Sequence, residues 1–175
     1  LLAQTAGVLA AYGIKIQAAL LSVTASGFSL DSFVTRSESW SLLQDASLRK
    51  GLEDALVEAA KNGVVPETRL SERQRAEELL RRELKPIKPR VLFDSEASER
   101  ATVVDVFARA SVTLLRDIAK TIFEVGASIE LARITTEGRQ SVDAFYLVDA
   151  SSRKPLTPNT KNKLREKLMA ALAID

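Results

Sequence analysis

Two stretches of this chain of 175 residues are similar to each other, and this repeat constrains the fold more than any other feature. The stretch LLAQTAGVLAAYGIKIQAALL, which starts at Leu1, aligns without gaps with LLRDIAKTIFEVGASIELARI, which starts at Leu114. The matching pairs are Leu1/Leu114, Leu2/Leu115, Ala6/Ala119, Gly13/Gly126, Ile16/Ile129 and Ala19/Ala132 and, after one extra residue in the first copy, Asp31/Asp143 and Phe33/Phe145. Such a repeat predicts two copies of one structural unit.

The second copy shows the periodicity of each element. ATVVDVFA alternates in hydrophobicity, as a strand does, whereas the apolar residues after Thr113 recur at helical spacing until Gly126. We expect a strand at 101–108, a helix that ends before Gly126, a hairpin of strands 128–137 and 141–149, and a last helix capped by Thr157 with Pro158. This order predicts an α+β fold, with helices on one face of an antiparallel sheet.

The first copy follows the same order but lacks an opening strand. We expect a helix at Leu2–Tyr12, strands at Ile14–Thr24 and Phe28–Arg36, and a helix within Ala46–Lys61 that Asn62-Gly63 ends. A sheet without its first strand leaves an edge unpaired, so we expect residues before Leu1 in the parent protein.

A charged segment separates the two copies. Ser71 stands three residues before Gln74, the spacing of a capping box, and predicts a helix over about residues 71–84 that Pro86 stops. The eight basic and four acidic residues of Arg69–Arg90 fit an RNA or phosphate surface. We favour a solvated bridging helix, because no aromatic residue is present there to stack on bases.

The composition excludes most catalytic chemistry. The chain has no cysteine and no histidine, which removes thiol nucleophiles, disulfides, histidine-bound metals and imidazole proton shuttles. A metal or acid–base site built from Asp105, Asp117 and Asp143 is an alternative that we do not favour, since Asp117 fits a solvated helix position and Asp143 a hairpin position. The apolar runs are interrupted and the net charge is only +2. We therefore expect no catalytic residue, metal or cofactor in this segment, no membrane contact and no nucleic-acid partner.

The repeat resembles the ACT domain, a small ligand-sensing module. RATVVDVFAR, LLRDIAKT and IELARITTEGRQSVDAFYLVD are similar to the end of the bifunctional PII uridylyltransferase/uridylyl-removing enzyme family, where two ACT domains follow a nucleotidyltransferase and a phosphohydrolase domain. The resemblance implies two ferredoxin-like sandwiches, with a first ACT domain at 1–61, a linker at 62–100 and a second ACT domain at 101–175.

The second copy departs from this family at its end. ACT domains usually close with a fourth strand after their second helix, but the chain stops soon after that helix, at Ile174-Asp175. RVLFD, at residues 90–94 of the linker, is a short strand candidate. We expect its Val91–Phe93 to pair with one of the two sheets.

The resemblance implies sensing and not catalysis. In that family, glutamine acting through the ACT region shifts the enzyme between uridylylating PII and removing the uridylyl group. We therefore expect a cytoplasmic segment that binds an amino acid such as glutamine, controls attached catalytic domains, and pairs its ACT domains within the chain or in a homodimer. The alternative is an assembly module that dimerises and has lost ligand binding.

The expected ligand turn departs from the family pattern. Where the family has Ala-Arg-Asp-Arg-Pro-Gly-Leu-Leu, this chain has Ala-Arg-Ala-Ser-Val-Thr-Leu-Leu from Ala108, so Thr113 replaces the glycine and Ala110 the aspartate. A β-branched side chain fills the space near a ligand, and an acceptor for an amino group is lost. The site residues that the resemblance implies are Ala110, Ser111, Thr113, Leu114 and Leu115 of the turn, Ala127 and Ser128 after Gly126, and Ile14 and Lys15 after Gly13.

Two interpretations of the turn stay open. In the first, Ser111 or Thr113 caps the helix and a different or weaker ligand binds. In the second, which we favour, the domain no longer binds the amino acid and serves as an architectural element beside its neighbour.

Overall fold

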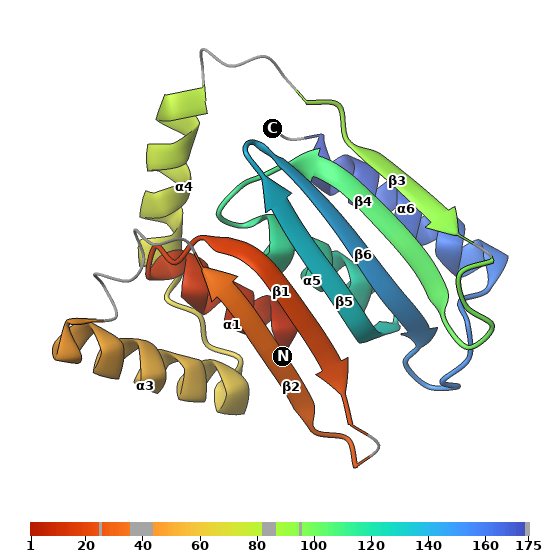
Figure 1. Ribbon diagram of the computed structural model, residues 1–175, viewed down its shortest axis with the longest axis horizontal. Helices are drawn as coiled ribbons and strands as arrows, with labels where there is room; N and C mark the ends of the chain where they lie inside the picture. Colours follow the sequence, from red (N-terminus) through yellow and green to blue (C-terminus); the bar gives the residue numbers. More distant parts are fainter. Residues whose placement is uncertain (25, 36–43, 82–86, 95, 174–175) are drawn as a thin grey trace. The chain divides into compact units, whose positions relative to one another are not determined.

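The computed structural model describes residues 1–24, 26–35, 44–81, 87–94 and 96–173, and its fold is α+β, as predicted (Figure 1). The elements are α1 (Leu2–Ala11), β1 (Ile16–Val23), β2 (Ser29–Thr35), α3 (Ala46–Asn62), α4 (Glu67–Arg81), β3 (Arg90–Asp94), β4 (Thr102–Arg109), α5 (Leu114–Glu124), β5 (Ala127–Glu137), β6 (Gln140–Asp149) and α6 (Pro158–Leu172). The predicted order of the second copy is confirmed by β4, α5, β5, β6 and α6. The predicted boundaries at Arg36, at 82–86 and at Ile174-Asp175 lie outside the described residues.

The chain divides into two units, each of which is discontinuous in sequence. We call them the helical unit, which is Leu1–Ile16, Thr35–Lys85 and Ser111–Ala119, and the sheet unit, which is Gln17–Val34, Pro86–Ala110 and Lys120–Asp175. The predicted domain bounds of 1–61, 62–100 and 101–175 group the residues differently, and they stay a prediction.

Strands from both sequence copies share one sheet of order β2-β1-β5-β6-β4-β3 (Figure 1). At its central junction, β1 pairs antiparallel with β5, with Ala19 opposite Ile134 and Leu21 opposite Ala132. β1 and β5 are the corresponding strands of the two copies. The arrangement is therefore compatible with two ferredoxin-like units joined edge to edge through equivalent strands.

The strand candidate RVLFD is confirmed as β3, at one edge of the sheet. It pairs antiparallel with β4, with Val91 opposite Val106 and Phe93 opposite Val104. The guanidinium carbon of Arg165 in α6 lies 5.0 Å from the centre of the Phe93 ring, close enough for a cation–π contact. The linker therefore supplies a fourth strand beside the three strands of the second copy.

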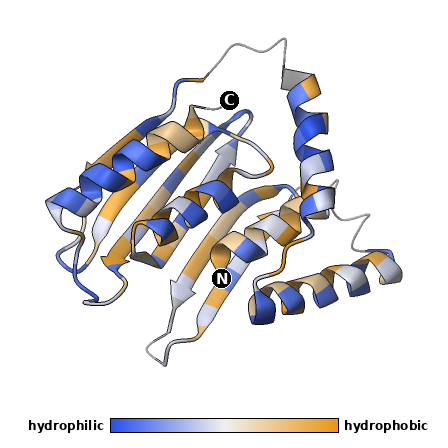
Figure 2. Cartoon of the chain, turned by 180° about the vertical axis from the view of Figure 1, so that it is seen from behind, coloured by the Kyte–Doolittle hydropathy of each residue, from blue (hydrophilic) through white to orange (hydrophobic). Residues whose placement is uncertain are grey.

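Helix α6 begins where the sequence predicts and lies across one face of the sheet unit (Figure 2). The hydroxyl of Thr157 accepts a hydrogen bond from the backbone N–H of Thr160 at 3.2 Å, and Pro158 at the first helical position has no N–H to satisfy. Leu164 and Leu168 of this helix are fully buried. The capping residues thus set the start of the helix, and its apolar side chains pack it into the core.

In the helical unit, α4 begins earlier than predicted. The backbone N–H of Leu70 already donates to the carbonyl of Pro66 at 3.0 Å, and the helix starts at Glu67. Ser71 is therefore not an N-cap; its hydroxyl donates to the Glu67 carbonyl at 2.8 Å inside the helix. The physical reason is that a proline followed by an acidic residue favours a helix start. Helix α3 ends at Gly63, as predicted.

Asp143 lies in the β5–β6 hairpin, as expected, but its side chain is buried in the sheet unit. It stands opposite Val106 of β4 and is 1% exposed. The Ser141 hydroxyl donates to Oδ1 of Asp143 at 2.6 Å, and the backbone N–H of Thr135 donates to the same oxygen at 3.4 Å. Burial raises the pKa of Asp143 to about 6, although both hydrogen bonds act to lower it.

The raised pKa of Asp143 predicts that the protein loses stability as the pH rises. The folded-state pKa lies above the unfolded-state value, so at pH values between these two the folded state binds more protons than the unfolded state. The free energy of unfolding therefore falls as the pH rises and the carboxyl ionises. We expect a loss of about 2 kcal/mol between about pH 4.5 and about pH 7 from this group alone. Urea unfolding at both pH values measures it. In Asp143→Asn that part of the pH dependence should vanish; an unchanged pH dependence would contradict the assignment.

Candidate ligand-binding site

The predicted ligand turn leads from β4 into α5 and is held by backbone hydrogen bonds. The N–H of Ala110 donates to the carbonyl of Arg139, and the N–H of Asp117 donates to the carbonyl of Thr113, both at 2.9 Å. The residues Thr113, Leu114 and Leu115 are buried, and Ala110 and Ser111 are half-buried. The turn thus forms without the glycine of the family pattern.

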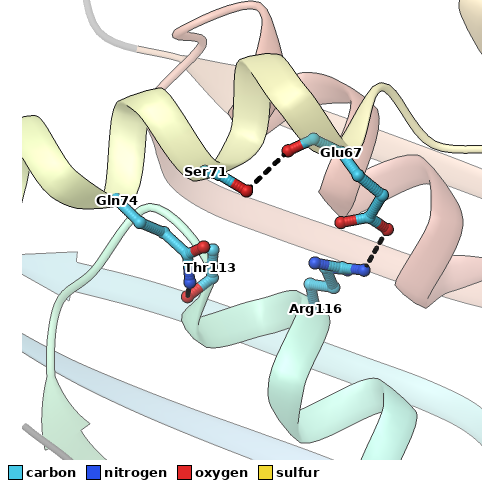
Figure 3. Close-up of polar contacts among 5 residues, drawn as sticks. All are labelled: Glu67, Ser71, Gln74, Thr113 and Arg116. Carbon is cyan, nitrogen blue, oxygen red and sulfur yellow. Dashed lines mark hydrogen bonds and ion pairs between the residues drawn. The ribbon is translucent and has the colours of Figure 1, made fainter.

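Helix α4 of the linker contacts this turn (Figure 3). The backbone N–H of Val112 donates to Oε2 of Glu77 at 2.9 Å, and Nε2 of Gln74 donates to the Thr113 hydroxyl at 3.4 Å. Leu70 of α4 is fully buried, in an apolar cluster against which Val112 packs. The carboxylate of Glu77 therefore occupies a backbone donor that the turn would otherwise offer to a ligand.

An ion pair holds α4 against the start of α5 (Figure 3). Oε1 of Glu67 lies 2.5 Å from a guanidinium nitrogen of Arg116. The stem of Arg116 passes close to Gly7 of α1, where a Cβ would lie 3.2 Å from Cδ of Arg116 and 3.0 Å from Cγ1 of Val65. The absence of a side chain at Gly7 thus lets Val65, which precedes α4, and Arg116 of α5 lie close to α1 within the helical unit.

The linker helix is more than the solvated bridge that its charge pattern predicts. Leu70, which precedes the predicted helix, is fully buried, whereas Leu79, within the predicted helix, is 65% exposed. Nothing in the sequence marked Gln74 and Glu77 as contacts of the turn, because amide and acidic side chains are usual on solvated helix faces. Their role becomes visible only in the folded chain, where α4 reaches the turn.

The predicted contacts after Gly126 lie in the sheet unit. Ala127 begins β5 and is buried, and Ser128 is half-buried. The hydroxyl of Ser128 accepts a hydrogen bond from Arg153 at 3.2 Å, and Arg153 also forms an ion pair with Glu130. An arginine of the chain itself therefore already uses the Ser128 hydroxyl.

The predicted contacts after Gly13 lie in the helical unit, beside a cavity. Ile14 is 6% exposed and lines this cavity of about 480 Å³, whereas Lys15 is exposed. Tyr12 and Ala11 at the end of α1 also line it. The remaining lining residues are Leu48 and Leu52 of α3 and Arg69, Glu72, Arg73 and Ala76 of α4.

The predicted site residues thus fall into two sets. Ile14, Lys15 and Ser111–Leu115 belong to the helical unit, whereas Ala110, Ala127 and Ser128 belong to the sheet unit. Ligand contact at any of these residues stays a prediction.

Asp105, Asp117 and Asp143 lie in β4, α5 and β6 respectively. Among the residues that the structure describes, no three acidic side chains are grouped so that they could hold a metal ion. In the same part of the chain, no helix is long and apolar enough to cross a membrane.

Removing the Glu77 carboxylate should release the Val112 amide. We expect amide hydrogen exchange at Val112 to become about tenfold faster in Glu77→Ala, since a hydrogen bond to a charged group contributes about 1.5 kcal/mol and about 1.4 kcal/mol corresponds to a factor of ten. NMR-detected exchange measures the rate. Glu78→Ala, an exposed neighbour on the same helix, is the matched control and should leave it unchanged. Equal rates in the wild type and Glu77→Ala would show that the contact contributes nothing.

Comparison with known proteins identifies relatives along the whole chain. A bifunctional uridylyltransferase/uridylyl-removing enzyme from Gluconobacter oxydans is 35% identical over an alignment of 179 residues that covers 98% of this chain and 18% of the relative. Enzymes of the same description from Phenylobacterium zucineum and Caulobacter vibrioides are 45% identical over 49% of the chain and 36% identical over 69% of it. These alignments cover 9% and 12% of the two relatives. No family model matches the chain. No solved structure matches it either.

The chain therefore spans less than a fifth of the length of these curated relatives. The longest of the three alignments includes both sequence copies and the linker between them. The homologues of this chain are thus bifunctional uridylyltransferase/uridylyl-removing enzymes, and the chain corresponds to a segment of them.

Proposed function

We propose that this chain is a regulatory segment of a bifunctional uridylyltransferase/uridylyl-removing enzyme and senses an amino acid, glutamine by its resemblance to tandem ACT domains. Binding controls attached nucleotidyltransferase and phosphohydrolase domains, which act on the PII signal protein in nitrogen regulation in the cytoplasm. The observation that carries this proposal is the similarity to such enzymes over 98% of a chain that has neither cysteine nor histidine.

The mechanism that we propose is linkage between ligand binding and the arrangement of the helical unit. Helix α4 contacts the turn through Glu77 and contributes Arg73 to the wall of the cavity. A ligand that binds more tightly when α4 is in one position increases the population of that position. The size of the shift is set by the difference in binding free energy between the two positions of α4. Attached domains that favour the same position are then controlled by the ligand concentration.

A second candidate function is an assembly module without a ligand. The observation that favours it is the hydrogen bond from the Val112 N–H to Glu77, because it leaves this donor of the turn already satisfied by the chain itself. The buried Thr113 stands where the family pattern has a glycine, and this replacement also favours the assembly function. On this alternative, the scaffold serves dimerisation or pairing of the two copies.

Calorimetric titration of L-glutamine into the full chain distinguishes the two functions. Sensing predicts saturable heat with a stoichiometry of at most one ligand per copy, together with a higher unfolding temperature at saturating glutamine, because a ligand that binds only the folded state stabilises it. The other amino acids at equal concentration serve as controls for specificity.

Light scattering after size-exclusion chromatography tests the assembly function on the same samples. No heat with any amino acid, combined with a stable dimer at micromolar concentration, would reject sensing and support assembly. Saturable heat with glutamine would show that assembly is not the only function of this segment.

A further inference from the structure

The cavity in the helical unit has two kinds of wall. Leu48 and Leu52 of α3 and Ala76 of α4 supply apolar surface, and Leu52 is buried. Helix α4 adds the charged side chains of Arg69, Glu72 and Arg73 to the same cavity. A volume of about 480 Å³ lies within the range of about 300–1,000 Å³ that is usual for small-molecule sites.

The guanidinium group of Arg73 lies against the backbone of Gly13. A Cβ built at Gly13 would be 2.9 Å from Cζ of Arg73, so a side chain at this position would push the flexible end of Arg73 aside. Gly13 also has a φ of +73°, a conformation that other residues rarely adopt. Gly13 therefore leaves room for the guanidinium group of Arg73 just after the end of α1.

The guanidinium carbon of Arg69 lies 4.9 Å from the centre of the Tyr12 ring, within reach of a cation–π contact. Neither Arg69 nor Arg73 forms an ion pair with any residue of the described ranges. Two guanidinium groups that form no ion pair within the described part of the chain thus border one cavity, and guanidinium groups bind carboxylates well through paired N–H donors.

Among the residues that line the cavity, Glu72 is the one with a carboxylate. A ligand with a carboxylate for the arginines, an ammonium group for Glu72 and a short side chain for the leucines would match all three parts of the wall. A free α-amino acid has these groups.

We infer that this cavity binds a free α-amino acid, with Arg73 and Arg69 on its carboxylate and Glu72 on its ammonium group. The inference rests on the proposed sensing function and places the ligand between the first copy and the linker helix α4, away from the turn at 110–113, where Glu77 already uses the Val112 N–H. Among the residues predicted from the sequence, Ile14 is the one that lines this site.

Helix α4 connects this site to the turn. The side chains of α4 that line the cavity are those of Arg69, Glu72, Arg73 and Ala76. Those that contact the turn and the start of α5 belong to Glu67, Gln74 and Glu77. A ligand in the cavity therefore stabilises the position of α4 that also holds the turn. Saturating ligand is expected to slow amide exchange at Val112.

Titration of L-glutamine, and then of the other protein amino acids, into the full-length Arg73→Met variant tests the site. Met keeps much of the stem but has no charge and no N–H donors, so we expect the best ligand to bind at least about tenfold more weakly. Arg75→Met, on the same helix but outside the cavity lining, is the matched control and should bind within about twofold of the wild type. Circular dichroism melting of each variant checks that it folds.

The outcomes separate this inference from the proposed function. Equal affinity of Arg73→Met and the wild type would overturn the site and leave sensing intact. No binding of any amino acid by the wild type would overturn both. If Arg73→Met does not fold, Arg69→Met takes its place, and undiminished affinity there would overturn the site.

Discussion

The antiparallel pairing of β1 with β5 is the interaction on which the rest of the sheet depends. Ala19 and Leu21 of β1 are buried, as are Ile134 and Ala132 opposite them. The hydrogen bonds of this pair also remove one exposed edge from the strands of each copy, and unpaired edges are prone to association with other chains. The sheet then extends through β2 on one side and through β6, β4 and β3 on the other.

Helix α4 has a comparable role in the helical unit. Leu70 anchors it in an apolar cluster, Glu67 pairs with Arg116, and Glu77 accepts the N–H of Val112. The same helix contributes Arg73 to the cavity. The segment that the sequence marks as a charged linker thus connects two of the three places where a ligand was expected, the turn before α5 and the residues after Gly13.

Parts of the candidate site followed directly from the sequence, and others did not. The alignment of Gly13 with Gly126 placed Ile14 and Ala127 at equivalent positions, and in the structure Ile14 precedes β1 and Ala127 begins β5. The burial of Asp143 was not predictable, because alternation along β6 shows which residues share a face but not how deeply one polar residue is covered. The partners of Ser128 could not be predicted either, since Arg153 lies 25 residues away in sequence.

The sequence by itself determined the doubled α+β unit, the end of α3, the start of α6 and the strand within RVLFD, because periodicity and capping are local properties that neighbouring residues express. Only the tertiary structure decided that equivalent strands of the two copies meet in one sheet, that Glu77 lies on the backbone of the turn 35 residues away, and that Arg73 lies over Gly13 at the wall of a cavity. These are contacts between side chains and backbone far apart in the sequence, and their partners are set by how the elements pack.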